Sequence, residues 1–123
     1  MGDLSLGNTI MKSYQGIVKH GSKRAAALGY PTINIPLEDR NLTGIYAAKV
    51  KVGGKEYLAA AFADTTRKVL EAHLLDFSGM LYGKSIEIEL LQNIRETKTF
   101  SDDTALRAAI ADDVKRVQAY FKK

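Results

Sequence analysis

A chain of 123 residues fits one domain with a buried core. It has no cysteine, which excludes disulfides, thiolate catalysis and cysteine-ligated metal sites, and no apolar run of the roughly 18 residues that a membrane span needs. The net charge of +4 favours polyanionic partners, meaning nucleic acid, nucleotides or acidic lipid. Because the first residues also lack the basic start and apolar centre of a signal peptide, we expect a cytoplasmic protein without a membrane partner.

The first half of the chain predicts three strands separated by loops. Residues 1–12 are interpreted as an N-terminal extension or linker remnant, and residues 13–123 as the folded domain. Residues 13–19 predict the first strand and residues 32–35 a short second one. The small and basic segment 21–30 between them predicts a loop with at most one helical turn. A third strand is expected over residues 44–52.

The alternation within residues 44–52 places one apolar face on that strand, formed by Tyr46, Ala48, Val50 and Val52.

A Gly-Gly pair at 53–54 then predicts a two-residue hairpin turn that returns through residues 55–62. Two further strands are expected over residues 69–76 and 84–91, the latter with alternating apolar and polar positions.

The C-terminal segment predicts an amphipathic helix that begins after Ser101, a favourable N-cap, with Asp102 and Asp103 at the positive end of the helix dipole. Its apolar positions recur at helical spacing and are Leu106, Ile110, Val114, Val117 and Phe121. Five or six short strands followed by one helix predict a mainly β fold, an antiparallel barrel closed by a C-terminal helix.

Thr32 and Asn34 alternate with Ile33 and Ile35, so a strand would place the two polar side chains on one face. Hydroxyl and amide oxygens are hard, neutral donors suited to Mg²⁺ when phosphate oxygens and water complete its octahedral shell. On spacing alone, a polar strand start is the plainer interpretation, and both alternatives stay open.

The segment 21–29 is a second candidate. Its glycines and alanines let backbone N–H groups approach an anion, and Lys23 and Arg24 add positive charge. It lacks the G-x-x-x-x-G-K-[ST] pattern of a Walker loop. A solvated surface loop is the alternative interpretation.

Glu71 is an acid within an otherwise apolar predicted strand, on the same face as His73. A carboxylate in this setting is either a surface residue of an edge strand or a general base for a hydroxyl nucleophile. His73 is interpreted as a satisfied core histidine, with a supporting contact to Glu71 as the alternative.

Tyr82, Arg95 and Phe100 carry planar groups that can stack on a flat heterocycle. Phe100 could instead form a hydrophobic staple before the Ser101 cap, and the pattern alone favours the staple.

The order of these motifs resembles the ATP-dependent riboflavin kinases of bacteria and eukaryotes. Residues 21–34 (GSKRAAALGYPTIN) are similar to their G-x-x-R-G-R-x-L-G-[FY]-P-T-A-N motif, and residues 44–47 (GIYA) to their G-V-Y-A strand. Residues 70–77 (LEAHLLDF) resemble V-E-V-H-L-L-D-F, followed by LYG at 81–83. The resemblance extends over about residues 16–114 and ends with Ile94-Arg95, Phe100, Leu106 and the motif I-x-x-D at 110–113.

This resemblance implies a six-stranded antiparallel Greek-key barrel with a C-terminal helix, acting as a monomer on riboflavin and ATP to give FMN and ADP. Thr32 and Asn34 would bind Mg²⁺ and nucleotide phosphate, and Glu71 would take the proton from the ribityl 5′-hydroxyl. Further nucleotide-binding residues would be Gly21, Lys23, Arg24 and Ala27, and flavin-binding residues Arg95, Thr97 and Phe100.

The chain departs from the family pattern in three places. Ala25 and Ala26 stand where the family has Gly and Arg, residues 63–68 replace a longer segment with an I-G-x-R-P-T motif, and no adenylyltransferase half is present. The last departure is expected for a stand-alone kinase or an excised domain. A non-catalytic flavin- or nucleotide-binding module is the alternative function. A nucleic-acid-binding barrel is disfavoured because few basic residues adjoin the strand tyrosines.

Overall fold

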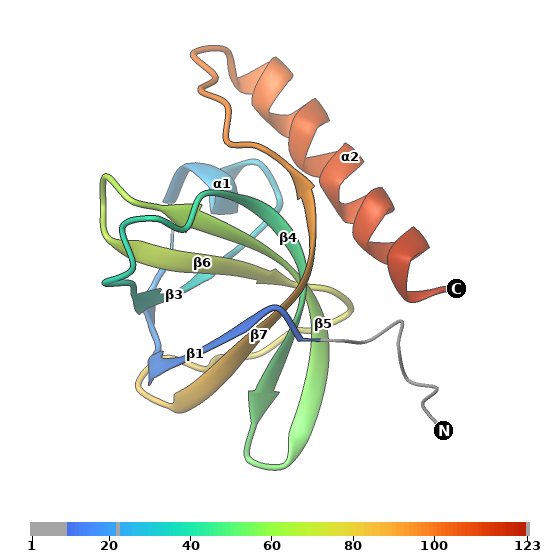
Figure 1. Ribbon diagram of the computed structural model, residues 1–123. Helices are drawn as coiled ribbons and strands as arrows, with labels where there is room; N and C mark the ends of the chain where they lie inside the picture. Colours follow the sequence, from blue (N-terminus) through green and yellow to red (C-terminus); the bar gives the residue numbers. More distant parts are fainter. Residues whose placement is uncertain (1–9, 22, 123) are drawn as a thin grey trace.

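The computed structural model describes residues 10–21 and 23–122 (Figure 1). The extension predicted at residues 1–12 lies outside them except for its last three residues, so this boundary stays a prediction. No helix in the described part of the chain has the length and apolar character needed to cross a bilayer.

The described residues form seven strands and two helices. In chain order they are β1 (Lys12–Ile17), β2 (Lys19–His20), α1 (Lys23–Ala27), β3 (Ile33–Pro36), β4 (Gly44–Val52), β5 (Lys55–Asp64), β6 (Val69–Leu74), β7 (Ser85–Arg95) and α2 (Asp103–Phe121). The mainly β fold with a C-terminal helix is therefore confirmed, and so is a helical turn in the segment 21–30. The strand expected at 84–91 is longer and runs to Arg95.

All strand pairs are antiparallel, in the order β1-β7-β4-β5-β6-β3-β2. The strands β4, β5 and β6 form a meander and β7 returns beside β4, which is the Greek-key arrangement. The outermost strands β1 and β2 are consecutive and separated by Val18 alone, whose backbone bonds to residues 83 and 84 instead. Counted as one bent strand, they give the six strands expected from the sequence, and the bend lets the sheet curl back onto itself.

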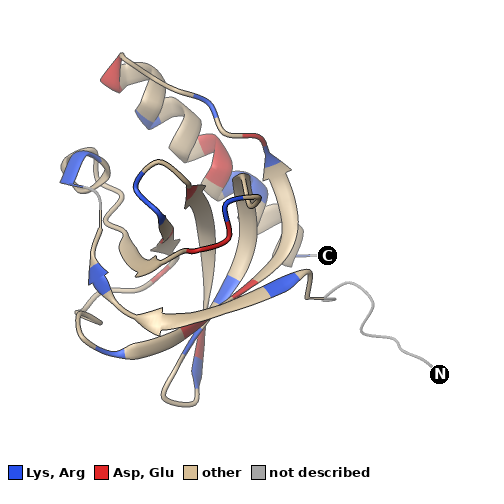
Figure 2. Cartoon of the chain, turned by 60° about the vertical axis from the view of Figure 1, so that its left-hand side comes forward, with Lys and Arg blue, Asp and Glu red and all other residues tan. Residues whose placement is uncertain are grey.

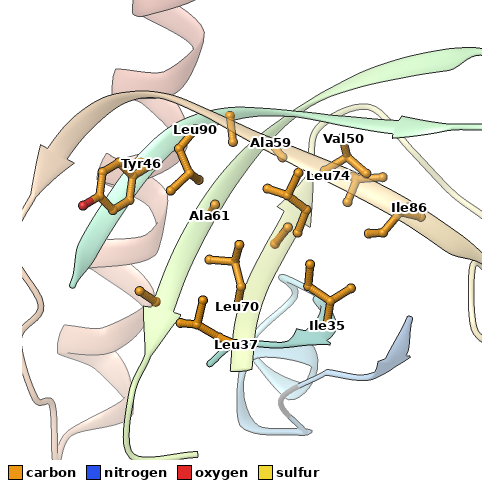
Figure 3. Packing of buried hydrophobic residues seen from close by; sticks show 14 of the residues in the cluster. Ile35, Leu37, Tyr46, Val50, Ala59, Ala61, Leu70, Leu74, Ile86 and Leu90 are labelled. Carbon is orange, nitrogen blue, oxygen red and sulfur yellow. The ribbon is translucent and has the colours of Figure 1, made fainter. Parts of the chain in front are cut away.

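The inner face of the curled sheet holds the main core (Figure 3). The alternation expected in β4 is confirmed, since Tyr46, Ala48, Val50 and Val52 belong to this core or pack against it. On β5 the fully buried inward residues are Ala59, Ala61 and Ala63, which are 0–3% exposed, and Tyr57 packs against the same core. Residues as small as these alanines let neighbouring strands curve tightly around one core.

Helix α2 covers the outer face of the sheet, where it packs on β4, β5 and β7 (Figure 1). Val117, which is completely buried, joins Ala47 and Leu75 in a second cluster beneath the helix. The expected N-cap at Ser101 is wrong. Asp102 caps the helix, because its backbone is extended and its carboxylate accepts a hydrogen bond from the Thr104 N–H at 3.1 Å.

Hydrogen bonds and an ion pair to Asp39 connect the segment after β3 with β1. The Asp39 carboxylate accepts hydrogen bonds from Lys12 and the Tyr14 hydroxyl, both at 2.9 Å, and from the Asn41 N–H. These donors lower the pKa of Asp39 from 3.8 to about 2. None of these four residues lines the cleft described next.

Candidate active site

A cleft of about 470 Å³ opens on the outer face of the sheet, beside the first half of α2. Its floor comes from the strands β4, β5 and β6, and its walls from α1, the β5–β6 turn, the loop 96–102 and α2. The lining mixes apolar side chains, among them Ile45, Phe62 and Ile110, with charged ones. Figure 2 shows that acidic and basic residues are spread over several separate elements of the chain rather than gathered in one block. A cleft of this size and mixed character suits a small organic ligand that also bears anionic groups.

The polar residues of β3 and β6 meet on this outer face. Asn34 lies directly opposite Glu71 in the antiparallel register, and Phe62 of β5 lies opposite Glu71 on the other side. The Thr32 hydroxyl donates a hydrogen bond to the Glu71 carboxylate, with the two oxygens 3.2 Å apart. The sequence prediction that Thr32 and Asn34 share one face is confirmed, since Ile35 points into the core on the other side.

Asn34 has an unusual environment for an amide. The residue is 2% exposed, and its Oδ1 atom has no hydrogen-bond partner among the described residues. A buried carbonyl oxygen without a partner costs about 1–3 kcal/mol of stability. Asn34 Oδ1 is also a hard oxygen donor. Asn34 lies opposite Glu71 in the sheet and two residues after Thr32 in the chain. This donor set fits a magnesium ion that takes its other ligands from phosphate oxygens and water.

Gly21 explains how the chain approaches Thr32 so closely. A Cβ atom at position 21 would lie 2.0 Å from the Thr32 backbone oxygen and 2.2 Å from its hydroxyl oxygen. Only a residue without a side chain fits there. The glycine therefore positions Thr32 rather than leaving open space for a ligand.

Replacing Gly21 with alanine is expected to destabilise the fold by about 1–3 kcal/mol, the usual cost of overpacking, and to weaken magnesium–ADP binding because Thr32 must move. Urea denaturation and titration calorimetry measure the two effects. Gly54→Ala is the control: position 54 has a φ of +85° and no atom within 4 Å of a new Cβ. This variant should lose stability through backbone strain and keep its nucleotide affinity.

Two arginines of the cleft form close ion pairs with carboxylates of α2. Arg95 forms a bidentate ion pair with Asp113, from Nε to Oδ1 at 2.7 Å and from Nη2 to Oδ2 at 2.8 Å. Asp113 is only 4% exposed. Arg24 donates from Nε to Asp103 at 2.8 Å and from Nη1 to the Phe100 carbonyl at 3.0 Å. Arg24 thus ties α1 to the loop and helix on the other side of the cleft.

The remaining predicted residues are distributed as follows. Thr97 and Phe100 line the cleft with Arg95, while Lys23 and Ala27 are exposed on α1 and do not line it. Phe100 was expected to stack on a flat heterocycle or to form a staple; in the structure Arg95 and Lys98 each lie 5.8 Å from its ring centre. With the cap at Asp102, the staple position falls on Ser101, so the staple interpretation of Phe100 is wrong.

His73 and Tyr82 have partners that the sequence did not indicate. The Nδ1 atom of His73 lies 2.8 Å from the Pro31 carbonyl oxygen, and its ring packs edge-on against Tyr30. It is satisfied, as predicted, although it is half-buried and lines the cleft rather than the core. Tyr82 stacks on His20, away from Arg95 and Phe100.

Two charged residues of the cleft, Asp113 and Arg67, were given no role in the site by the sequence reasoning. Asp113 occupies an inward position on the apolar stripe of α2, and that placement of an acid was the available signal. Arg67 lies in the β5–β6 turn, with Nη1 3.5 Å from Glu71 Oε2. The sequence indicated Arg67 only weakly, because a cation four residues before the candidate base is a common arrangement.

Comparison with known proteins identifies the family to which this chain is similar. The riboflavin kinase (flavokinase) family profile matches residues 10–121. The chain is 37% identical over 113 residues to a bifunctional riboflavin kinase/FMN adenylyltransferase of Pseudomonas fluorescens, which covers 85% of this chain and 36% of that protein. It is 31% identical over 135 residues to the Bacillus subtilis protein of the same description, covering 98% and 43%. The chain therefore spans well under half the length of these curated relatives.

Two solved structures share the fold. A riboflavin kinase from Trypanosoma brucei superposes with a TM-score of 0.63 at 28% identity, over 90% of this chain and 80% of that one. A structure described as a macrolide-efflux protein from Streptococcus pneumoniae superposes with a TM-score of 0.73 at 27% identity, over 86% of this chain and 38% of the other.

Proposed function

The chain belongs to the riboflavin kinase family, and on that premise we propose that it transfers the γ-phosphoryl group of ATP to the 5′-hydroxyl of riboflavin, giving FMN and ADP. The observation that carries the proposal is the convergence of Thr32, Asn34 and Glu71 on the outer face of the sheet. The neutral side-chain oxygens of Thr32 and Asn34, suited to a metal–phosphate group, thus lie next to the Glu71 carboxylate. A protein that only bound the ligands would not need this carboxylate.

We assign the parts of the reaction to residues as follows. Glu71 holds the ribityl hydroxyl and takes its proton as the oxygen attacks the γ-phosphorus. A divalent cation, with Mg²⁺ as our proposal, would be held by Thr32 and Asn34 and would neutralise charge on the nucleotide phosphates. The cleft wall formed by Arg95, Thr97 and Phe100 offers planar and apolar surface for the flavin. Positioning and charge stabilisation supply most of the rate enhancement in such transfers.

The direct test is incubation of the protein with riboflavin, ATP and Mg²⁺, followed by chromatography. We expect FMN to appear with one ADP per FMN, and EDTA to abolish it. Binding of riboflavin and nucleotide without turnover would favour the alternative, a non-catalytic module of the same fold. Ala25 and Ala26 of α1 are the feature that favours this alternative, because they leave the nucleotide side of the cleft with fewer cations.

An enzyme that consumes ATP works where ATP is made available, so we also propose a cytoplasmic location. We propose that the protein acts as a monomer, since Thr32, Asn34 and Glu71 meet within a single folded chain without a residue from a second copy. Light scattering at micromolar concentration measures the oligomeric state.

A further inference from the structure

The cationic side chains that line the cleft differ in how closely they are paired with carboxylates. Those that line it among the described residues are Arg24, Arg67, Arg95 and Lys98. Arg24 and Arg95 are committed to carboxylates at 2.8 Å or less. Lys98 lies over the Phe100 ring in the loop 96–102. Arg67 is the cleft arginine with the longest ion pairs, at 3.5 Å to Glu71 and 3.9 Å to Asp64.

Both of these ion pairs approach Arg67 through the same nitrogen, Nη1. A guanidinium has five N–H donors in a planar fork that matches the oxygens of a phosphoryl group. The side chain is about half exposed, at 49%, so an incoming ligand can reach it. Arg67 therefore keeps donor capacity beside the carboxylate that we assign as the base.

The turn that carries Arg67 is held in a costly conformation. Lys68, the next residue, has a φ of +58°, in the left-handed region that non-glycine residues rarely adopt. Two hydrogen bonds fix this turn. The Arg67 N–H donates to the Asp64 side-chain oxygen Oδ1 at 3.0 Å, and the Leu37 N–H donates to the Lys68 carbonyl oxygen at 2.8 Å. A local strain of about 1–3 kcal/mol that the surroundings maintain is a frequent feature of functional sites.

We propose that Arg67 is a further catalytic residue, which binds the equatorial oxygens of the phosphoryl group during its transfer. This inference rests on the proposed kinase function. The acceptor hydroxyl must sit beside Glu71, and the phosphate-binding pair Thr32 and Asn34 adjoins the same carboxylate. The phosphorus in transit therefore passes close to Glu71 Oε2, and the Arg67 guanidinium is already 3.5 Å from this atom.

The step balances without any further reactant. A bond forms between the hydroxyl oxygen and the γ-phosphorus while the bond from that phosphorus to the β–γ bridging oxygen breaks. ADP leaves with the electron pair of the broken bond, and the hydroxyl proton passes to the Glu71 carboxylate. The negative charge on the three equatorial oxygens requires a hydrogen-bond donor outside the metal site to stabilise it, and Arg67 supplies that donor.

The test uses Arg67→Gln and Arg67→Lys in the full chain. We expect Arg67→Gln to lower kcat by about 100-fold or more, in line with the removal of other transition-state donors, with magnesium–ADP affinity within threefold of the wild type. Binding of riboflavin with magnesium–ADP and aluminium fluoride, which mimics the phosphoryl group in transit, should weaken by a similar factor. Arg67→Lys should recover part of both losses, because it restores the charge without the planar fork.

Arg40→Gln is the matched control, since Arg40 is an exposed arginine of the loop after β3 that does not line the cleft. It should leave every parameter unchanged. Wild-type-like kcat and fluoride-complex affinity in Arg67→Gln would overturn the inference while the kinase function stands. An equal loss of ADP and fluoride-complex affinity would also overturn it, because Arg67 would then only bind the ground state. If the wild-type protein formed no FMN, both the proposed kinase function and the proposed role of Arg67 would be wrong.

Discussion

Glu71→Gln is expected to lower the rate of FMN formation by about 10²–10⁴-fold, the range usually supplied by a positioned general base. Glutamine keeps the size of the side chain and can still accept the hydrogen bond that Thr32 donates to position 71. It cannot accept the proton of the ribityl hydroxyl. The loss should therefore appear in kcat, with magnesium–ADP affinity and thermal stability close to those of the wild type.

Single-turnover formation of FMN, followed by chromatography, measures this effect without a contribution from product release. Glu38→Gln is a suitable control because Glu38 is exposed in the segment after β3, outside the cleft. If Glu71→Gln turned over at more than a tenth of the wild-type rate, Glu71 would not be the base.

Asn34→Leu should separate metal binding from stability. Leucine has nearly the shape of asparagine but lacks the buried oxygen, Oδ1, that has no hydrogen-bond partner among the described residues. Removing an unpaired buried polar atom is close to neutral or stabilising, so we expect the midpoint of thermal unfolding without ligands to hold or rise. The affinity for magnesium–ADP should fall by about 10- to 100-fold, since a metal ligand is lost.

Calorimetric titration with ADP, in the presence of Mg²⁺ and again in EDTA, isolates the metal-dependent part. The variant should bind ADP equally well in both conditions, whereas the wild type should bind more tightly with Mg²⁺. Leu37→Met tests whether any substitution near β3 disturbs binding, because Leu37 is buried in the core on the other side of the sheet. An Asn34→Leu protein with full magnesium dependence would remove Asn34 from the metal site.

Much of the fold followed from local patterns in the chain. Period-two alternation in residues 44–52 and the glycine pair at 53–54 predicted the β4–β5 hairpin correctly, and both glycines have the positive φ that such a turn requires. The small difference in strand number arose because nothing in the sequence marks Val18 as a bend. The error at Ser101 arose because serine and aspartate are equally good caps, so two adjacent candidates could not be separated.

The ion-pair partners of the arginines could not be predicted from local patterns. Arg24 was expected on the nucleotide, yet it is bonded to Asp103, which is 79 residues away in the chain. Arg95 and Asp113 are likewise brought together from β7 and α2. A long, flexible side chain has many acidic partners within reach, and only the packed arrangement of the elements selects one of them.

Local sequence alone predicts that Thr32 and Asn34 share a face and that Glu71 lies in an apolar strand, because side-chain direction along a strand depends only on its period of two. The tertiary structure decided that these three residues meet, since the β3–β6 register sets Asn34 opposite Glu71 across 37 residues of chain. It also decided that Asn34 Oδ1 is buried without a partner and that Arg67 approaches the carboxylate. Burial and long-range pairing depend on how the sheet curls and what covers its outer face, and no local pattern encodes either of them.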